Sequence, residues 1–389
     1  NSEWMQRATG GGNDSNVKQH SISAWVKRTE LGGTQMILSM ANIGRVRFNS
    51  SNKIEYQFRS GRNFTTTRVF RDTSAWYHIF VVADTTLSTA GDRMKLYING
   101  VRETVFDSYT APDLNHGSPA WGVYNTYNLN FAGKSDDFYN GYIAETFFIG
   151  EQSLLPTDFG EFDEDSGIWK PKEYTGTFGS NDTYLDFKDS SNLGNNAAGG
   201  ADLSLNNITS ADQATDTPTN NFCTFNPLIN NNASGYYLAI TNGGTLATQT
   251  ANNYAAGFGT MGVSSGKWYF EIKIASGASN AFVTGIGMGY QERLSTSLGH
   301  TVYMYDAVRY NNDGNLGGFS SASYGLNDII SIALDMDAST PTCTVYKNGT
   351  AGGNLFASLT PAAGTGLNNT GLQADFYFPY VTAYSARTL

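Results

Sequence analysis

A run of carboxylates at Glu161, Asp163, Glu164 and Asp165 is the segment of this sequence that comes closest to a catalytic site. Two carboxylates held about 5 to 5.5 Å apart can hydrolyse a glycosidic bond with retention of configuration. The run lies beside Gly160 and outside the segments that alternate like strands, so nothing in the pattern sets that distance. We interpret the run as a solvated acidic loop and expect that the chain is not an enzyme.

The histidines give no better support for catalysis. All four, His20, His78, His116 and His300, are isolated, and no closely spaced pair exists. A catalytic zinc ion needs three protein ligands, so a zinc site lacks ligands at usable spacing. His78 stands in a strand-like segment, and we interpret it as a packed core or edge residue.

The two cysteines, Cys223 and Cys343, are far apart in the sequence and neither belongs to a C-x-x-C pair. This spacing excludes the usual metal and redox motifs. A single disulfide and two unrelated free thiols both remain open.

Calcium is the one cofactor for which the sequence offers candidate ligands. Ca²⁺ binds carboxylate and amide oxygens that loops bring together. The best candidate segment supplies Asp136, Asp137 and Asn140, and a second one runs from 311 to 315. The competing interpretation is an ordinary turn rich in Asp, Asn and Gly.

Aromatic residues beside polar ones are candidates for sugar binding, because an exposed ring can stack on a sugar while polar groups orient its hydroxyls. With 13% aromatic residues in the chain, many rings must instead fill cores. Alternation between 121 and 125 leaves Tyr124 on the face opposite Trp121, so one of these two rings should be exposed. The candidate glycan-binding residues are Trp121, Tyr124, Tyr127, Tyr139, Tyr305, Tyr310 and Asn311.

Strands must position these residues, because alternation with a period of two dominates the sequence. Ile22, Ala24 and Val26 share one face of a predicted strand, and residues 53–59 alternate in the same way. Such patterns indicate half-buried strands of antiparallel sheets. Residues 76–82 are continuously apolar, as expected in the middle of a sandwich.

Turn signals complete the all-β pattern. Two strand-like segments end in Asn-Gly, at Asn99-Gly100 and at Asn348-Gly349, and this pair is the strongest short signal for a hairpin. No segment of ten or more residues has a convincing helical period.

The amino-acid composition agrees with an all-β fold, and the net charge limits the possible partners. The 389 residues suit two domains, and the chain combines 43 Gly with only 15% charged residues. A net charge of -10 repels phosphate backbones, so we expect no nucleic-acid partner. The longest apolar runs have the length of strands, so we expect no membrane insertion.

The first 150 or so residues resemble a LamG-type, concanavalin A-like jelly roll. The resemblance depends on the segments 21–27, 76–82, 95–101 and 140–145 in their order and spacing. Some members of that family are glycosidases with an E-x-D-x-E motif. Here Asp165 stands at the last position, which speaks against that activity.

The last 165 or so residues resemble a SPRY domain, itself a bent β-sandwich. The matching segments are 265–271, 329–335 and 345–349. The sequence thus predicts an all-β chain of two antiparallel jelly-roll sandwiches. The expected domains are 1–155 and 223–389, joined by a polar connector at 156–222.

The connector is similar to segments in structural proteins of tailed phages, at 156–171 and again at 216–222. This resemblance implies a virion-surface, extracellular module such as a tail fibre or adhesin, which binds host-surface glycan without catalysis. The alternative is a capsid or tail decoration protein that docks onto other virion proteins. Under either interpretation we expect multiple copies, because single glycan sites are weak.

Overall fold

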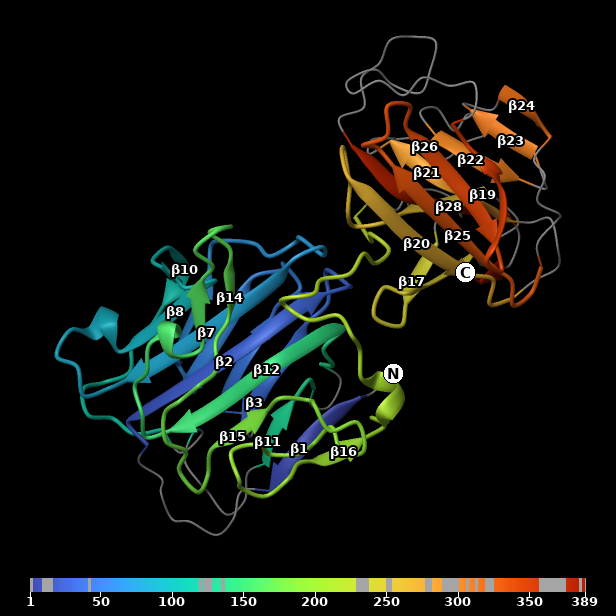
Figure 1. Ribbon diagram of the computed structural model, residues 1–389. Coiled ribbons are helices and arrows are strands. Elements are labelled where there is room, and N and C mark those ends of the chain that lie inside the picture. Colours follow the sequence, from blue (N-terminus) through green and yellow to red (C-terminus); the bar gives the residue numbers. More distant parts are fainter. Residues whose placement is uncertain are drawn as a thin grey trace. The chain divides into compact units, whose positions relative to one another are not determined.

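The fold is described from a computed structural model of the chain (Figure 1). The structure describes residues 3–8, 17–40, 43–118, 121, 128–133, 137–228, 238–249, 254–276, 282–288, 301–305, 308–311, 314–318, 325–356, 376–384 and 387–388. The chain divides into two compact units, Asn1–Phe222 and Cys223–Leu389, each built from antiparallel sheets. None of the helices among the described residues is long and apolar enough to span a bilayer.

The larger sheet of the first unit has eight strands. Its members are β1 (Trp4–Ala8), β3 (Gln35–Met40), β4 (Gly44–Phe48), β5 (Ile54–Arg59), β6 (Arg62–Thr66), β10 (Phe106–Tyr109), β11 (Asn128–Phe131) and β16 (Ser204–Asn206). Their order across the sheet is β10-β6-β5-β4-β3-β11-β1-β16. Burial alternates along β5, so the half-buried strand predicted at 53–59 is confirmed, and β4 alternates in the same way.

The facing sheet has six strands. Its members are β2 (Gln19–Arg28), β7 (Trp76–Asp84), β8 (Met94–Ile98), β9 (Val101–Glu103), β12 (Gly141–Gly150) and β15 (Thr183–Leu185), in the order β15-β12-β2-β7-β8-β9. The inward residues of both sheets form one large apolar core, which includes Ile22, Phe48, Phe58 and Leu96. Burying a side chain of this size stabilises the fold by about 1.5–3 kcal/mol. The predicted all-β jelly-roll sandwich is confirmed.

The outward face of the six-stranded sheet is also buried, and here the prediction of a half-buried strand at 20–26 is wrong. Residues 20–28 of β2 are all buried, because Trp25 and Trp76 pack against Trp169 from the segment that follows β12. Phe80 and Phe147 pack against Phe159 from the same segment. In Figure 1 this green segment lies across β2 and β7.

The polar stretch from 151 to 222 belongs structurally to the first unit. Within it, β15 pairs with β12 and β16 pairs with β1, so it extends both sheets. It also contains a two-stranded sheet of β13 (Gly160–Phe162) and β14 (Trp169–Pro171), with the short helices η2 (Pro156–Asp158) and η3 (Ser210–Asp212). A further short helix, η1 (Ala90–Asp92), precedes β8.

The described part of the second unit forms three sheets. The smallest consists of β17 (Ala239–Thr241), β18 (Leu246–Gln249) and β29 (Arg387–Thr388). The largest has the order β19 (Tyr254–Phe258), β28 (Tyr377–Tyr384), β21 (Phe282–Met288), β22 (Thr301–Tyr305), β23 (Val308–Asn311) and β24 (Gly314–Gly318), and the third has the order β20 (Lys267–Lys273), β25 (Ile329–Asp335), β26 (Thr342–Lys347) and β27 (Thr350–Asn354). Its core includes Ile332, Val345 and Val381. Cys223 and Cys343 are free thiols, and Cys343 lies in this core.

Both predicted Asn-Gly hairpins are confirmed. Ile98 pairs with Val101 and Lys347 pairs with Thr350, so each turn has two central residues. All four central residues have positive φ, 49° and 77° in the first turn and 49° and 79° in the second. That backbone is the type I′ turn, which Asn and Gly tolerate with little strain.

Candidate functional site

The first unit has a cavity of about 560 Å³ that is lined by residues of both of its sheets. One wall comes from Met5 on β1 and Phe131 on β11, and another from residues 141–145 of β12. The segment from 208 to 219 contributes a third wall. The volume lies within the roughly 300–1,000 Å³ that is usual for small-ligand sites.

Glu145 is placed in this cavity by a bulge in β12. Between Ala144 and Phe147 the pairing with β2 shifts, so Glu145 and Thr146 together oppose the single residue Ala24. Glu145 has φ of 42°, in the left-handed region that costs a non-glycine residue about 1–3 kcal/mol. Bulges re-aim side chains, and strain of this kind is concentrated at functional sites in proteins.

Backbone strain gathers around the cavity more generally. Among the described residues other than Asn and Gly, positive φ occurs at Ala132, Glu145, Glu151 and Phe187. Three of these four, Ala132 (61°), Glu145 (42°) and Phe187 (55°), line the cavity. Most of the positive-φ positions among these described residues therefore lie around the cavity.

The carboxylate of Glu145 is half-buried and held by one hydroxyl. Tyr184 donates its phenolic proton to Glu145 Oε2 at 2.5 Å. Burial raises the pKa of Glu145, and nearby Asp186 raises it further, while the hydrogen bond from Tyr184 and the charge of Lys188 act in the opposite direction. The carboxylate thus presents a hydrogen-bond acceptor in a partly dry environment.

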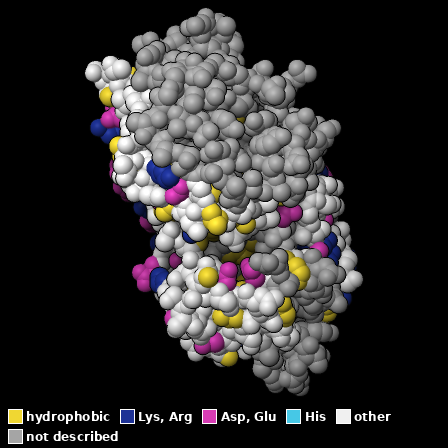
Figure 2. All heavy atoms as spheres, turned by 90° about the vertical axis from the view of Figure 1, so that its right-hand side faces the viewer, with side chains coloured by type: hydrophobic (Ala, Val, Ile, Leu, Met, Phe, Trp, Pro, Cys, Tyr) yellow, Lys and Arg dark blue, Asp and Glu magenta, His cyan; other side chains and the backbone are white. Residues whose placement is uncertain are grey.

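An aromatic ring and further acidic groups complete the lining. Tyr142 is half-buried, and burial followed by the charge of Asp216 raises its pKa to about 12. Gln213 lines the cavity, and its side chain is fixed because Nε2 donates to the carbonyl of Phe187 at 2.6 Å. The space-filling view shows a similar mixture at the surface, where acidic side chains in its lower half lie beside hydrophobic ones (Figure 2).

Two of the aromatic residues predicted to bind glycan belong to the core instead. Trp121 is 1% exposed and packs against His20, Tyr56 and Phe148, so neither face of its indole is free. Tyr139 is one of the residues that line the cavity, but it is only 8% exposed and its ring is part of the main apolar cluster. An aromatic residue in a sandwich gains more by filling the core than by facing water.

The other predicted glycan-binding residues stay predictions. Tyr124 and Tyr127 lie outside the described residues. In the second unit, Tyr305 belongs to β22, and Tyr310 and Asn311 belong to β23.

The two calcium candidates that the structure describes, Asp137 and Asn140, already have protein partners. The carboxylate of Asp137 already forms an ion pair with Arg47 at 3.3 Å, and a cation in that place disfavours a second one. Asn140 donates a hydrogen bond to Glu30 Oε2 at 2.6 Å, and Asp136 lies outside the described residues. In the part of the chain that the structure describes, no cluster of three or more His, Cys, Asp or Glu is placed to hold a metal ion.

The hydroxyl of Ser23 lies 2.8 Å from His78 Nε2, an arrangement that resembles a serine nucleophile beside a histidine base. Trp169, however, donates its indole proton to His78 Nδ1 at 2.9 Å, so the ring proton must reside on Nε2. Nε2 then donates to Ser23 and cannot accept its proton. Both residues are fully buried, and burial lowers the pKa of His78 to about 3. The pair is structural, as predicted for His78.

The acidic run begins with Glu161 on β13 and continues into a surface turn at 163–165 that is stabilised by its own side chains. Asp163 accepts hydrogen bonds from Ser166 and forms an ion pair with Lys170 at 3.0 Å. Lys170 also lies 3.6 Å from Glu161. Hydrogen bonds from Ser166 and the neighbouring Lys170 lower the pKa of Asp163, which keeps it ionised.

Sequence reasoning missed Glu145 and Tyr142. One signal was present, since Glu145 is the only carboxylate within the apolar segment 141–149. The bulge that turns it into the cavity arises from pairing with β2 and leaves no mark in the local pattern.

Residues 7–146 match the sequence profile of the concanavalin A-like lectin/glucanases superfamily, over a little more than a third of the chain. No curated protein matches the sequence. Similar solved structures include the SPRY domain of human HERC1, with 19% identity, a TM-score of 0.31, and coverage of 39% of this chain and 89% of that one.

Two similar structures come from bacterial proteins. A putative carbohydrate-binding protein from Bacteroides ovatus has 12% identity and a TM-score of 0.36, over 54% of this chain and 57% of that one. Domain 4 of AbnA, an arabinanase from Geobacillus stearothermophilus, in complex with arabinotriose, has 20% identity and a TM-score of 0.27, over 36% of this chain and 65% of that one.

Proposed function

We propose that this chain is a non-catalytic carbohydrate-binding protein and that the cavity beside Glu145 holds the sugar. The observation that carries the proposal is the bulge that places a strained, partly buried carboxylate in a cavity of ligand size. The match of residues 7–146 to the concanavalin A-like lectin/glucanases superfamily supports it.

The cavity favours an uncharged sugar. Glu145 and Asp186 line it and offer acceptors for hydroxyl groups, while Tyr142 and Phe187 offer aromatic surface. Lys188 is the only Lys or Arg among the described residues of the lining, and it lies 3.5 Å from the carboxylate of Asp186. Sugars that carry carboxylate or sulfate groups would meet repulsion there.

The lack of catalysis is part of the proposal and rests on two observations. The one Ser–His contact described above has its ring proton on the wrong nitrogen for base catalysis. The acidic loop binds Lys170 and its own backbone, and it is exposed. Neither group presents a nucleophile and a base to a bound sugar.

The biological setting that we propose is the exterior of a phage particle, with the chain acting as part of a tail fibre or adhesin on host-surface polysaccharide. This part rests on the similarity of 156–171 and 216–222 to segments of phage structural proteins. Several copies on one particle would raise the apparent affinity, because each site after the first binds at a high effective concentration.

The test is binding to a broad glycan array, followed by titration of the best neutral oligosaccharide. Glu145→Gln should weaken binding roughly 10- to 100-fold, since a hydrogen bond to a charged group contributes about 1.5–3 kcal/mol. Glu161→Gln is the matched control at an exposed position on β13 and should bind like the wild type. Equal affinity of all three proteins would refute the cavity as the site, and cleavage of any glycan would refute a non-catalytic role.

One observation favours the alternative of a decoration protein that docks onto other virion proteins. Leu155, Phe162 and Ile168 are 60%, 54% and 66% exposed. Apolar side chains at this exposure are typical of docking surfaces when they adjoin. A blank glycan array, together with stable binding of the chain to virions that lack it, would favour this alternative.

A further inference from the structure

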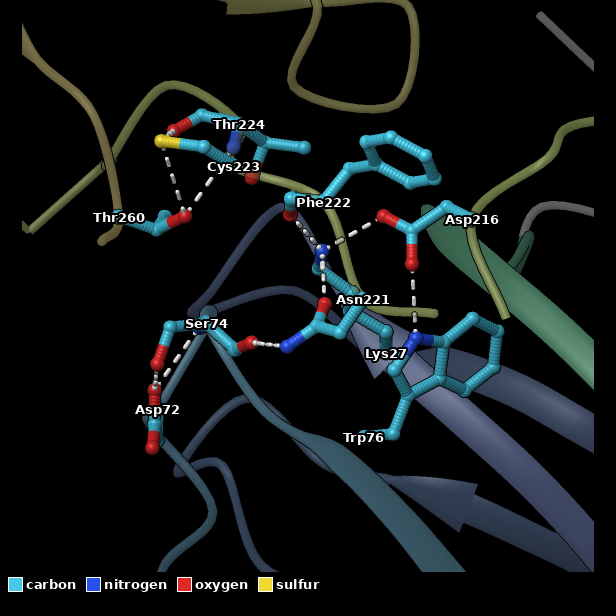
Figure 3. A network of polar contacts seen from close by, with 10 residues as sticks. All are labelled: Lys27, Asp72, Ser74, Trp76, Asp216, Asn221, Phe222, Cys223, Thr224 and Thr260. Carbon is cyan, nitrogen blue, oxygen red and sulfur yellow. Dashed lines mark hydrogen bonds and ion pairs between the residues drawn. The ribbon is translucent and has the colours of Figure 1, made fainter. Parts of the chain in front are cut away.

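The side chain of Lys27, on strand β2, is completely buried and its amine has three neighbours in the last turn of the first unit (Figure 3). Nζ lies 2.7 Å from Asp216 Oδ2 and 2.7 Å from the side-chain oxygen of Asn221. The backbone carbonyl of Phe222 is 2.6 Å away. A lysine amine, a carboxamide and a carboxyl group therefore meet at one point.

The two partners of Lys27 are fixed in orientation by other bonds, as Figure 3 shows. Asn221 donates its amide N–H to the carbonyl of Ser74 at 2.7 Å. Trp76 donates its indole N–H to Asp216 Oδ1 at 2.9 Å, so Oδ2 remains directed at the amine. The amine is held against the Asn221 amide, and since Oδ1 is bonded to Cγ, it also lies next to the amide carbon.

We propose that Lys27 and Asn221 become joined by an amide crosslink, with Asp216 as the proton carrier. The reaction needs only these three side chains. It requires no metal, oxidant or other reactant, because an amine and a carboxamide together contain every atom of the product.

The steps balance as follows. Lys27 gives one proton to Asp216 Oδ2, and rotation about the Cε–Nζ bond turns the free electron pair toward Cγ of Asn221. A new N–C bond forms at Cγ, Asp216 passes its proton to the departing Nδ2, and the new amide nitrogen gives one proton back to Asp216. The Cγ–Nδ2 bond breaks and ammonia leaves. Lys-NH₂ and Asn-CONH₂ have become Lys-NH-CO-Asn and NH₃.

Burial is what favours the first step. The side chains of Lys27 and Asp216 are 0% and 5% exposed, and the ring of Tyr142 lies 5.6 Å from the amine. Two opposite charges without water are costly, and proton transfer within the pair removes both of them. A desolvated lysine that has lost its proton is a nucleophile. A fixed near-attack geometry supplies much of the remaining rate.

The position of Asn221 suits the departure of ammonia. Its hydrogen bond to Ser74 lies at the surface, so Nδ2 faces the exit while Oδ1 faces the buried amine. Hydrolysis of the product would need water at the buried side, where Lys27 is fully covered.

The crosslink would join two positions 194 residues apart in the chain. It would attach the end of the first unit to β2, a central strand of the six-stranded sheet, immediately before Cys223 begins the second unit. A pull applied from the second unit would then reach β2 through a covalent bond, which suits a protein that holds a particle to a surface.

The test is the intact mass of the full chain, expressed and kept folded at neutral pH. We expect a mass lower than that of the sequence by one ammonia, about 17 Da. Tryptic mapping should show the peptides of Lys27 and Asn221 as one branched species, without cleavage after Lys27. Full mass and two separate peptides, after prolonged incubation of folded protein, would overturn the proposal.

Variants separate this reaction from others that release ammonia. Asn221→Ala should have the full mass of its own sequence, and this surface substitution leaves Lys27 paired with Asp216, so folding is retained. Asp216→Asn should also prevent the loss, whereas Asn220→Ala, the adjacent control, should keep it. Succinimide formation at an Asn-Gly pair loses the same mass, so a loss that persists in Asn221→Ala would assign it there and refute the crosslink.

Discussion

Acid should weaken the first unit through two buried histidines, His20 and His78. Both are 0% exposed, and burial lowers the pKa of each to about 3 from an ordinary value of 6.5. His20 is surrounded by aromatic rings, with Phe58 stacked at 5.7 Å and Trp121 at 4.9 Å, and its Nε2 lies 2.7 Å from the hydroxyl of Tyr56. Protonation of either ring is therefore strongly disfavoured while the ring stays buried.

The direction and size of the effect follow from these pKa values. Between pH 6.5 and pH 3 the unfolded chain binds a proton at each histidine that the folded chain does not bind, so stability is present above pH 6.5 and is lost as the pH falls. Going from pH 7 to pH 5, each histidine should lower the free energy of unfolding by about 2 kcal/mol. The two together give about 4 kcal/mol.

The assay is urea unfolding at pH 7 and pH 5, followed by tryptophan fluorescence. Five of the six tryptophans lie in residues 1–222, so the signal reports mainly on the first unit. His20→Phe keeps an aromatic ring among its neighbours and should halve the pH-dependent loss, to about 2 kcal/mol. The phenol of Tyr56 loses a partner in this variant, but that cost is the same at both pH values.

The control is His116→Gln, because His116 lies outside the buried clusters. It should show the same loss between pH 7 and pH 5 as the wild type. A loss under about 1 kcal/mol in the wild type, or an unchanged loss in His20→Phe, would refute the argument that buried neutral histidines set the acid stability.

Three further predictions concern other parts of the chain. Trp169→Phe should lower the free energy of unfolding by about 1–3 kcal/mol, because it leaves His78 Nδ1 buried without a donor. The control Ile168→Ala, at an exposed position, should change the free energy of unfolding by less than about 0.5 kcal/mol in the same urea assay. In the folded chain a thiol reagent should modify Cys223 and leave Cys343 intact until denaturant is added. The reason is that Cys343 is fully buried and burial raises its pKa. Equal rates of modification at the two cysteines would contradict this. Glycan binding should survive EDTA, because Asp137 is already paired with Arg47, and complete loss in EDTA would show that a calcium site exists after all.

Local sequence was sufficient where a structural feature depends on a few neighbouring residues. The Asn-Gly pairs at 99 and 348 specified two-residue turns, because few other residues adopt positive φ twice in succession. Alternation at 53–59 specified a strand with one buried face. The strand-like segment around His78 indicated a packed core or edge residue, and its contacts with Ser23 and Trp169 place it in the core.

Tertiary structure decided what depends on contacts between distant residues. Alternation in 20–26 indicates one buried face, and only the docking of Trp169 buries the other. Trp121 stands in a polar segment of the sequence, yet its ring is buried in the core.

The candidate site and the crosslink depend on distant contacts in the same way. Glu145 reaches the cavity through a register shift against β2, and Lys27 meets Asn221 across 194 residues. A sequence states which side chains are available. Which of them meet is determined by the pairing of strands and by the exclusion of water between them.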